Sequence, residues 1–439
     1  MSESVDANTL LPKQRVGRNA GIMGSANTIG GLMALVAVTL GARVLTPVEF
    51  GTVVFLHAVV IALTEATAFQ SWQLVVREGS KGLAAGSTEH FARTVRFSLG
   101  LDIVSAIVGF SLSALFVVFS PSTDGPLSAV APLTALGYFS LIIFRQTSAS
   151  LGVLRIFGRY DLMAISTTTR PFLRMVGSIC VAVMGGGLIE FIIAWFIACA
   201  ASYVAAAIFG LLELQRRGHL RDVFSAPPTL RAPAEGAWKF TWLANVSGAL
   251  DGGTRQLPLI LVGIVAGPAP AGLFKIAMEV SSLVSKAVRT VDRVVFPAFA
   301  ANDAHGDKGA SQRLVLRTAL AFALGGGTLF AALALVGQPI LSALFGEAYG
   351  AAANTAAVLV LAVTLGAVAS PVLSAQMAEG RLRGPVLLRL AGLLTMLATF
   401  WPFTENFGVI GSAAAVLAGS TFVVVGAGFS AARDRSKAD

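Results

Sequence analysis

Twelve long apolar runs constrain what this chain can fold into more than any other feature of its sequence. A helix that crosses the hydrocarbon core of a bilayer needs about 20 mostly apolar residues. The strands of a membrane barrel would instead show alternating segments of about ten residues, whereas these runs are apolar on all sides. The sequence therefore predicts an all-α polytopic membrane protein with spans at 21–42, 50–69, 97–119, 127–144, 163–184, 188–212, 240–265, 271–288, 314–336, 351–373, 386–401 and 407–431.

The overall composition agrees with a chain that dissolves in lipid. Of 439 residues, 55% are hydrophobic and only 13% are charged, against roughly a quarter charged in an average soluble domain. This composition argues against a soluble enzyme, a disordered tail protein, a fibre and a disulfide scaffold. The two cysteines, Cys180 and Cys199, lie inside apolar runs, so they indicate neither a disulfide framework nor a metal site.

The distribution of Lys and Arg predicts the orientation in the membrane. With the N-terminus inside, the cytoplasmic segments hold 23 of the 32 Lys and Arg residues, and the outside loops hold one, Arg43. By the positive-inside rule, this asymmetry places both termini in the cytoplasm. The net charge of +9 is therefore a topology signal, and nucleic acid is not an expected partner. The first apolar run is too long for a signal-peptide core, so we expect an uncleaved first span.

An offset of about 221 residues reveals an internal repeat. Turn residues at matching topological places coincide at this offset: Pro47 with Pro268, Gly51 with Gly272, Gly158-Arg159 with Gly380-Arg381, Gly187 with Gly408, and Ile189 with Ile410. Because six spans separate the copies, both halves have the same orientation. The sequence predicts two six-helix lobes related by a pseudo-twofold axis along the membrane normal, an arrangement found in transporters with a site between halves. Chance coincidence of Gly and Pro at loops is the alternative.

The repeat and the loops together predict the domain organisation. A cytoplasmic N-terminal segment covers residues 1–20, and the first lobe covers 21–212. A cytoplasmic linker rich in proline follows at 213–238. The second lobe covers 239–432 and a cytoplasmic tail covers 433–439.

Charged residues within the predicted spans gather on a few helices. Such residues cost about 2.5–3.5 kcal/mol at mid-helix on insertion scales, and they usually face protein or a water-filled cavity. His57 and Glu65 lie in the second span, and Asp251 and Arg255 lie in the seventh. Asp251 and Arg255 are four residues apart and can pair along the helix, for structural or functional reasons. Glu65 is a candidate proton or cation carrier and His57 is a candidate titrating group, with structural hydrogen bonding as the alternative for both.

The eighth span carries a polar stripe. Its charged residues are spaced by 4, 7, 3 and 4 positions, which places them on one face of an α-helix: Lys275, Glu279, Lys286, Arg289 and Arg293. A face of this kind does not meet lipid, so we expect it to line water or an anionic ligand. A string of salt bridges within the protein is the alternative.

Enzyme motifs lack the context that their chemistry requires. The glycine triplets at 185–187 and 325–327 do not follow a strand, so neither predicts a phosphate-binding loop. The four histidines are isolated in sequence, and the outside loops are short. We therefore expect no catalytic residues, no metal site and no cofactor.

Several segments carry the pattern of a known family. They are LVG at 261–263, AGLFKIA at 271–277, VFPA at 295–298, ILSALFGEAY at 340–349, RVLTP at 43–47 followed by Phe50-Gly51, and GRY at 158–160. The chain resembles bacterial polysaccharide exporters of the Wzx or PST type, which belong to the multidrug/oligosaccharidyl-lipid/polysaccharide (MOP) superfamily. The resemblance covers nearly the whole chain. The chain differs from lipid II flippases, which have two additional C-terminal spans.

The resemblance implies a flippase in the bacterial inner membrane. Members of this family move an undecaprenyl-pyrophosphate-linked oligosaccharide to the periplasmic leaflet by alternating access through a cavity lined by spans one, two, seven and eight. The implied partners are that lipid-linked sugar, membrane lipid, and a polymerase and chain-length regulator of the same pathway. The residues expected to bind the pyrophosphate or sugar are Arg43, Arg255, Lys275, Lys286 and Arg289. The residues expected to couple H⁺ or Na⁺, or to form state-dependent ion pairs, are His57, Glu65, Asp251 and Glu279.

Three other functions stay open at this point. A cation-coupled multidrug efflux pump of the same superfamily would want acidic residues in its cavity, whereas the eighth span has an excess of Lys and Arg. A membrane-bound polymerase or ligase is disfavoured by the short outer loops. A non-transporting assembly partner is the third alternative.

Overall fold

The described part of the protein is helical, and it separates into two compact units. The computed structural model describes residues 13–120, 125–304, 308–378 and 383–435, with the side chains of 13–20, 22, 247–254, 289–290, 292–304, 308, 378 and 433–435 left out of the description. Unit 1 comprises residues 1–45 and 55–257, and unit 2 comprises residues 46–54 and 258–439. Throughout the described ranges the chain forms helices and turns and no strand, which confirms the predicted all-α class.

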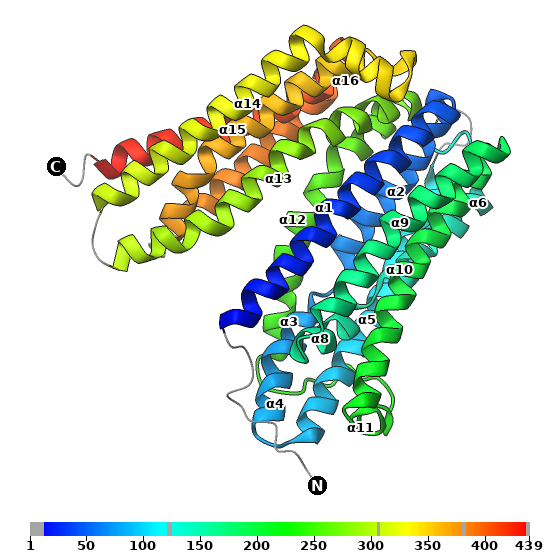
Figure 1. Ribbon diagram of the computed structural model, residues 1–439, viewed down its shortest axis with the longest axis vertical. Helices are drawn as coiled ribbons and strands as arrows, with labels where there is room; N and C mark the ends of the chain where they lie inside the picture. The colour runs from blue at the N-terminus through cyan, green and yellow to red at the C-terminus, as the bar shows by residue number, and fades with distance from the viewer. Residues whose placement is uncertain (1–12, 121–124, 305–307, 379–382, 436–439) are drawn as a thin grey trace. The chain divides into compact units, whose positions relative to one another are not determined.

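Unit 1 holds the N-terminal helices (Figure 1). Its elements are α1 (Lys13–Val44), most of α2 (Pro47–Thr67), α3 (Ser71–Leu74), a π-helical turn (Val75–Gly79), α4 (Ser80–Ala84), α5 (Thr88–Phe119), α6 (Pro132–Phe139), α7 (Leu141–Arg145), α8 (Ser148–Ile156), α9 (Tyr160–Met184), α10 (Leu188–Arg216), α11 (Leu220–Phe224) and the first part of α12 (Ala237–Ala266). Helix α9 packs between α1 and α10.

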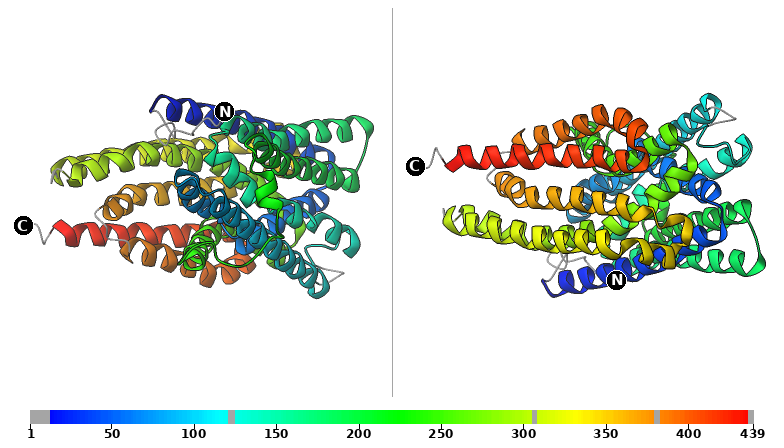
Figure 2. Two further views of the ribbon diagram at one scale, coloured as in Figure 1. Left: turned by 90° about the horizontal axis from the view of Figure 1, so that it is seen from below. Right: turned by 90° about the horizontal axis from the view of Figure 1, so that it is seen from above.

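Unit 2 holds the longest helices of the chain. It contains the first turns of α2, the last turns of α12, α13 (Pro268–Ala304), α14 (Lys308–Phe345), a 3-10 turn (Glu347–Tyr349), α15 (Ala352–Ala378) and α16 (Arg383–Arg435). Helix α15 packs against α13, α14 and α16, and Figure 2 shows these helices side by side. Helix α16 is broken at Gly408, whose φ of 60° and ψ of −140° divide it into two arms.

Helices that could cross a membrane are present in both units. Seven of the described helices are long and apolar enough by length and composition: 23–44, 47–67, 88–119, 188–216, 309–345, 352–377 and 383–432. Most of the expected spans coincide with the greater part of a helix of at least 21 residues.

The expected span over 127–144 is an exception, because the structure divides it between α6 and α7. The hydrogen bonding of the backbone changes at Ser140. The Ser140 N–H donates to the Leu136 carbonyl, four residues earlier, whereas the Ser140 carbonyl accepts from the Ile143 N–H, only three residues later. The Ser140 hydroxyl also donates to the Gly137 carbonyl at 2.7 Å. An apolar run gives no sign of such a change in backbone hydrogen bonding.

Polar side chains in unit 1 cap the starts of two of its helices. The buried carboxylate of Asp102 on α5 accepts the backbone N–H of Ala149 at 3.0 Å, at the start of α8. The start of α10 is capped in a similar way, since Glu190 accepts the N–H of Gly187 at 2.9 Å. The preceding turn needs Gly185, because its φ of 69° lies in the left-handed region. These caps satisfy amide groups that would otherwise lack partners.

Two glycines bring the starts of α2 and α13 into backbone contact within unit 2. A Cβ atom on Gly51 would lie 1.7 Å from the Pro268 carbonyl oxygen, and one on Gly272 would lie 3.2 Å from the Gly51 Cα. Phe50 packs edge-on against Tyr349, with ring centroids 5.7 Å apart. Gly51 and Gly272 are the two positions matched by the repeat offset in the sequence.

Candidate functional site

The residues expected to form the site are distributed over both units. Arg43, His57, Glu65, Asp251 and Arg255 belong to unit 1, whereas Lys275, Glu279, Lys286 and Arg289 belong to unit 2. The side chains of Asp251 and Arg289 lie outside the described residues. Arg43, in the last turn of α1, and Arg255, in α12, are both exposed. Each unit is described by itself below.

Glu65 is neutralised by a basic partner inside unit 1. Its Oε1 atom accepts a hydrogen bond from the Arg145 guanidinium at the end of α7. Both side chains are largely buried, with exposed fractions of 25% for Glu65 and 17% for Arg145. A partly buried pair of this kind is costly to break from one side only, because the other charge is left behind. The carboxylate expected to carry a cation thus has a structural partner 80 residues along the chain.

His57 belongs to a group of aromatic and basic side chains that we call the unit 1 polar core. Its members come from α2, α6, α9 and α10: His57, Tyr138, Arg170, Arg174, Trp195 and Tyr203. The His57 Nδ1 atom lies 3.0 Å from the Tyr138 hydroxyl, and its ring meets the buried Trp195 ring edge-on at 5.8 Å. On α9, the buried Arg174 guanidinium lies 3.6 Å from the centre of the Trp195 ring.

The α9 arginines are the part of this core that the sequence did not identify as a site. Arg170 donates to the Tyr203 hydroxyl at 3.4 Å. Arg170 and Arg174 lie four residues apart on one face of α9, as the helical repeat requires. Two arginines at this spacing inside an apolar run could have marked a polar site in the sequence. The sequence does not reveal their aromatic partners, because those lie on another helix. Guanidinium groups stacked on aromatic faces are well placed to keep a charge inside a membrane protein.

The stripe on α13 contains an ion pair along the helix. The Lys275 ammonium lies 2.6 Å from Glu279 Oε1, and both side chains are about three-quarters buried. The Ser282 hydroxyl donates to the Glu279 carbonyl at 2.7 Å. Lys286, further along α13, is exposed. The described half of the stripe therefore combines one compensated lysine with one lysine at the surface of unit 2.

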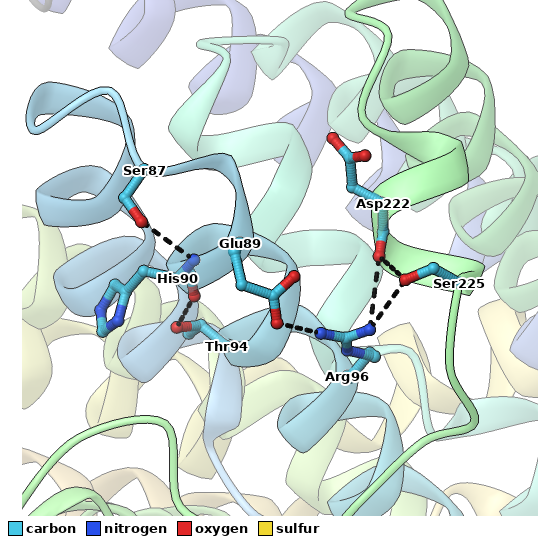
Figure 3. Close-up of polar contacts among 7 residues, drawn as sticks. All are labelled: Ser87, Glu89, His90, Thr94, Arg96, Asp222 and Ser225. Carbon is cyan, nitrogen blue, oxygen red and sulfur yellow. Dashed lines mark hydrogen bonds and ion pairs between the residues drawn. The ribbon is translucent and has the colours of Figure 1, made fainter.

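A second polar network ties the linker to unit 1. The buried Arg96 on α5 donates to Glu89 at 2.7 Å and to Ser225 at 3.0 Å, and it also reaches the Asp222 carbonyl at 3.5 Å (Figure 3). The backbone of Thr229 continues this attachment, donating to the Arg96 carbonyl at 3.3 Å. The expected linker, residues 213–238, is thus attached to α5 at Asp222, Ser225 and Thr229.

The turn between α10 and α11 gives unit 1 a pH-sensitive contact. The His219 ring stacks on Phe157 and also contacts Phe91. Burial against these rings lowers the pKa of His219 below its usual value of 6.5, although Asp222 opposes the shift. Folding therefore favours the neutral ring. The stabilising contribution is complete above pH 6.5 and is lost as the pH falls towards the pKa in the folded state.

We expect His219→Phe to reduce the acid sensitivity of the protein. Phenylalanine keeps the stacked ring and removes the protonation cost, so the thermal midpoint in detergent should fall less between pH 7.5 and 5.5 than in the wild type. Thermal unfolding at several pH values measures this slope. Equal slopes for the two proteins would show that His219 does not cause the sensitivity.

Groups of three or more His, Cys, Asp or Glu residues that could hold a metal ion are absent from the described residues. Several of the largely buried charges are instead compensated by ion pairs and aromatic rings, as for Glu65, Lys275 and Arg174.

Comparison with known proteins decides the family. Residues 40–354 match the family model described as "Polysaccharide biosynthesis protein". The chain is also 32% identical over 338 residues to the inner membrane protein YghQ of Escherichia coli (strain K12), covering 76% of this chain and 93% of that protein. The chain belongs to the polysaccharide biosynthesis protein family. This assignment confirms the resemblance found in the sequence motifs.

Solved structures show which fold this polysaccharide biosynthesis protein shares. A multidrug resistance MATE family transporter of the MOP superfamily, in its inward-facing conformation, superposes with a TM-score of 0.70 at 14% identity, covering 92% of this chain and 95% of that chain. The lipid II flippase MurJ, in an inward closed conformation, gives a TM-score of 0.67 at 12% identity over 93% and 87% of the two chains. The fold is that of MOP-superfamily transporters.

Proposed function

We propose that this protein is a flippase that moves an undecaprenyl-pyrophosphate-linked oligosaccharide across the bacterial inner membrane, for assembly of an exopolysaccharide, capsule or O-antigen. The observation that carries the proposal is the combination of a polysaccharide biosynthesis family match over residues 40–354 with a transporter fold. A polysaccharide pathway needs a transporter where its lipid-linked intermediate is made on one side of a membrane and used on the other.

The basic side chains of α12 and α13 support an anionic cargo. Arg255 and Lys286 are both exposed, so a ligand can reach each of them. Pyrophosphate oxygens accept charge-assisted hydrogen bonds, and the arginine fork suits them especially well. Lys275 keeps its compensating carboxylate, Glu279, which a pyrophosphate could replace in the loaded state. Arg43 and Arg289 complete the proposed set of ligands.

We propose the two-lobe arrangement with the domain bounds given above. The contact between Gly51 and Gly272 supports it, because these positions are equivalent in the repeat. The proposed orientation has both termini in the cytoplasm. Coupling to H⁺ or Na⁺ through His57, Glu65, Asp251 or Glu279 and association with a polymerase and chain-length regulator complete the proposal.

Reporter fusions test the orientation. Fusions at Gly267 and Glu405 should read periplasmic, whereas a fusion at Ala226 should read cytoplasmic, because nearly all loop Lys and Arg residues lie on the proposed inner side. Paired alkaline phosphatase and fluorescent protein fusions measure this. A cytoplasmic signal at Gly267 would contradict both the topology and the parallel repeat.

Multidrug efflux is the second candidate function, and the likeness to MATE family transporters favours it. The two functions predict different phenotypes in a strain that lacks the protein. A flippase mutant should lose surface polysaccharide and accumulate its lipid-linked repeat unit, whereas an efflux mutant should become sensitive to cationic amphiphiles. Extracting the lipid-linked sugars and measuring drug susceptibility in the same strain separates them. Drug sensitivity with unchanged polysaccharide would contradict the flippase proposal.

A further inference from the structure

Four helical segments of unit 2 line an open pocket of about 410 Å³. The walls are one face each of α13, α15 and the two arms of α16. The pocket-lining residues of α16 recur at helical spacing. Arg389, Gly392 and Met396 lie on the first arm, and Val416 and Ser420 lie on the second. This pocket lies within one unit and shares no residue with the proposed ligand set.

Glycines shape the pocket in two different ways. Gly392 and Gly419 let the α16 arms meet backbone to backbone, since a Cβ on Gly419 would lie 2.5 Å from the Gly392 carbonyl oxygen. At Gly366 on α15, by contrast, a Cβ would meet nothing within 4 Å. The space beside Gly366 is therefore open, and a larger side chain there would fill it.

The polar groups of the pocket contrast with its apolar lining. Arg389 lies less than two turns from the start of α16 at Arg383, and Ser370 lies near the end of the preceding helix α15. Ser285, in the middle of α13, also lines the pocket. Apolar side chains form most of the remaining lining, among them Val363, Met396 and Val416. One guanidinium and three serine hydroxyls thus line an otherwise apolar pocket.

Arg389 has no hydrogen bond or ion pair with any side chain in the described ranges, and it is exposed to the pocket and its surroundings. A guanidinium inside a membrane helix carries an insertion cost and calls for a partner. Phosphate oxygens match its fork of donors, and serine hydroxyls can donate to the same group. The apolar walls suit a hydrocarbon chain attached to that phosphate.

We infer that this pocket binds a glycerophospholipid of the bilayer, with its phosphodiester on Arg389 and an acyl chain between α15 and α16. Charge decides between this lipid and the proposed cargo. A phosphodiester carries one negative charge, which a single guanidinium balances. A pyrophosphate carries more negative charge and would be poorly compensated here, whereas α13 offers several basic groups.

Native mass spectrometry of the full-length protein in detergent tests the inference, with phosphatidylglycerol as the probe. Wild-type protein should retain one phosphatidylglycerol and should retain phosphate-free diacylglycerol about tenfold less. Arg389→Gln should weaken retention about tenfold or more, the usual effect of losing a charge-assisted hydrogen bond. Arg389→Lys should retain an intermediate amount. Gly366→Leu should also lose the lipid, because leucine fills the open space.

Matched controls separate this site from general lipid binding. Arg317→Gln removes an exposed arginine of α14, and Gly327→Leu enlarges a glycine of α14 that also has open space around it. Both should retain the lipid as the wild type does, and all variants are compared by size-exclusion profile. Equal retention in Arg389→Gln and the wild type would overturn the inference. So would stronger retention of undecaprenyl phosphate than of phosphatidylglycerol, which would assign the pocket to the cargo carrier.

Discussion

Gly51→Ala is expected to remove most of the folded protein from the membrane. The added Cβ would lie 1.7 Å from the Pro268 carbonyl oxygen and 2.4 Å from its carbonyl carbon, so it collides with backbone rather than with a movable side chain. The starts of α2 and α13 would have to separate, which also disturbs the contact between Phe50 and Tyr349. Overpacking costs about 1–3 kcal/mol and occasionally more. Fluorescence-detected size exclusion of a tagged protein measures the loss.

Gly325→Ala is the matched control for this prediction. It makes the same change inside a long apolar helix, but the new Cβ would meet nothing within 4 Å. Alanine also favours the helix by up to about 1 kcal/mol over glycine, so this variant should accumulate at least as well as the wild type. A normal monodisperse peak for Gly51→Ala would show that α2 and α13 do not meet as described.

Arg255→Ala is expected to lower polysaccharide export by about 10–100-fold while leaving the protein level unchanged. The side chain is exposed, so truncating it creates no cavity, whereas a lost charge-assisted hydrogen bond to pyrophosphate costs about 1.5–3 kcal/mol. Arg255→Lys should retain part of the activity because it keeps the charge. Arg313→Ala, which removes an exposed arginine of α14, should export normally. Quantified surface polysaccharide and immunoblotting provide the two readouts.

A purely structural role for Arg255 makes a different forecast. In that case Arg255→Ala would lower the protein level by leaving Asp251 without its helical neighbour. The double variant with Asp251→Ala would then restore both protein level and export. Restored export in the double variant would exclude Arg255 as a ligand of the cargo.

The sequence could predict most of the long helices because their signal is local. An apolar run of about 20 residues is enough to predict a membrane helix. Glycines in the sequence mark turns between such runs, and Gly185 does adopt the positive φ that favours glycine. The apolar run over 127–144 does not predict the break between α6 and α7, where the backbone hydrogen bonding changes at Ser140. The π-helical turn at 75–79 was likewise invisible in the residue pattern.

The polar site was harder to predict, because its meaning depends on partners distant in sequence. The pair between Lys275 and Glu279 follows directly from their spacing along one helix. Glu65 looks equally available in sequence, yet it pairs with Arg145 on another helix. Arg174 has no acidic residue at helical spacing beside it in the sequence, yet it stacks on Trp195 of another helix. Helical spacing reveals contacts within one helix, whereas contacts between helices need the fold.

Translocation by the purified protein is the most direct test of the proposed function. Proteoliposomes would contain a fluorescent undecaprenyl-pyrophosphate oligosaccharide in both leaflets, and an impermeant glycosidase outside would cleave only the sugars that it can reach. With the wild-type protein nearly all of the labelled sugar should become accessible, whereas with Arg255→Ala cleavage should stop at the outer-leaflet share. Cleavage that stops at the outer-leaflet share with the wild-type protein as well, as in protein-free liposomes, would contradict the flippase assignment.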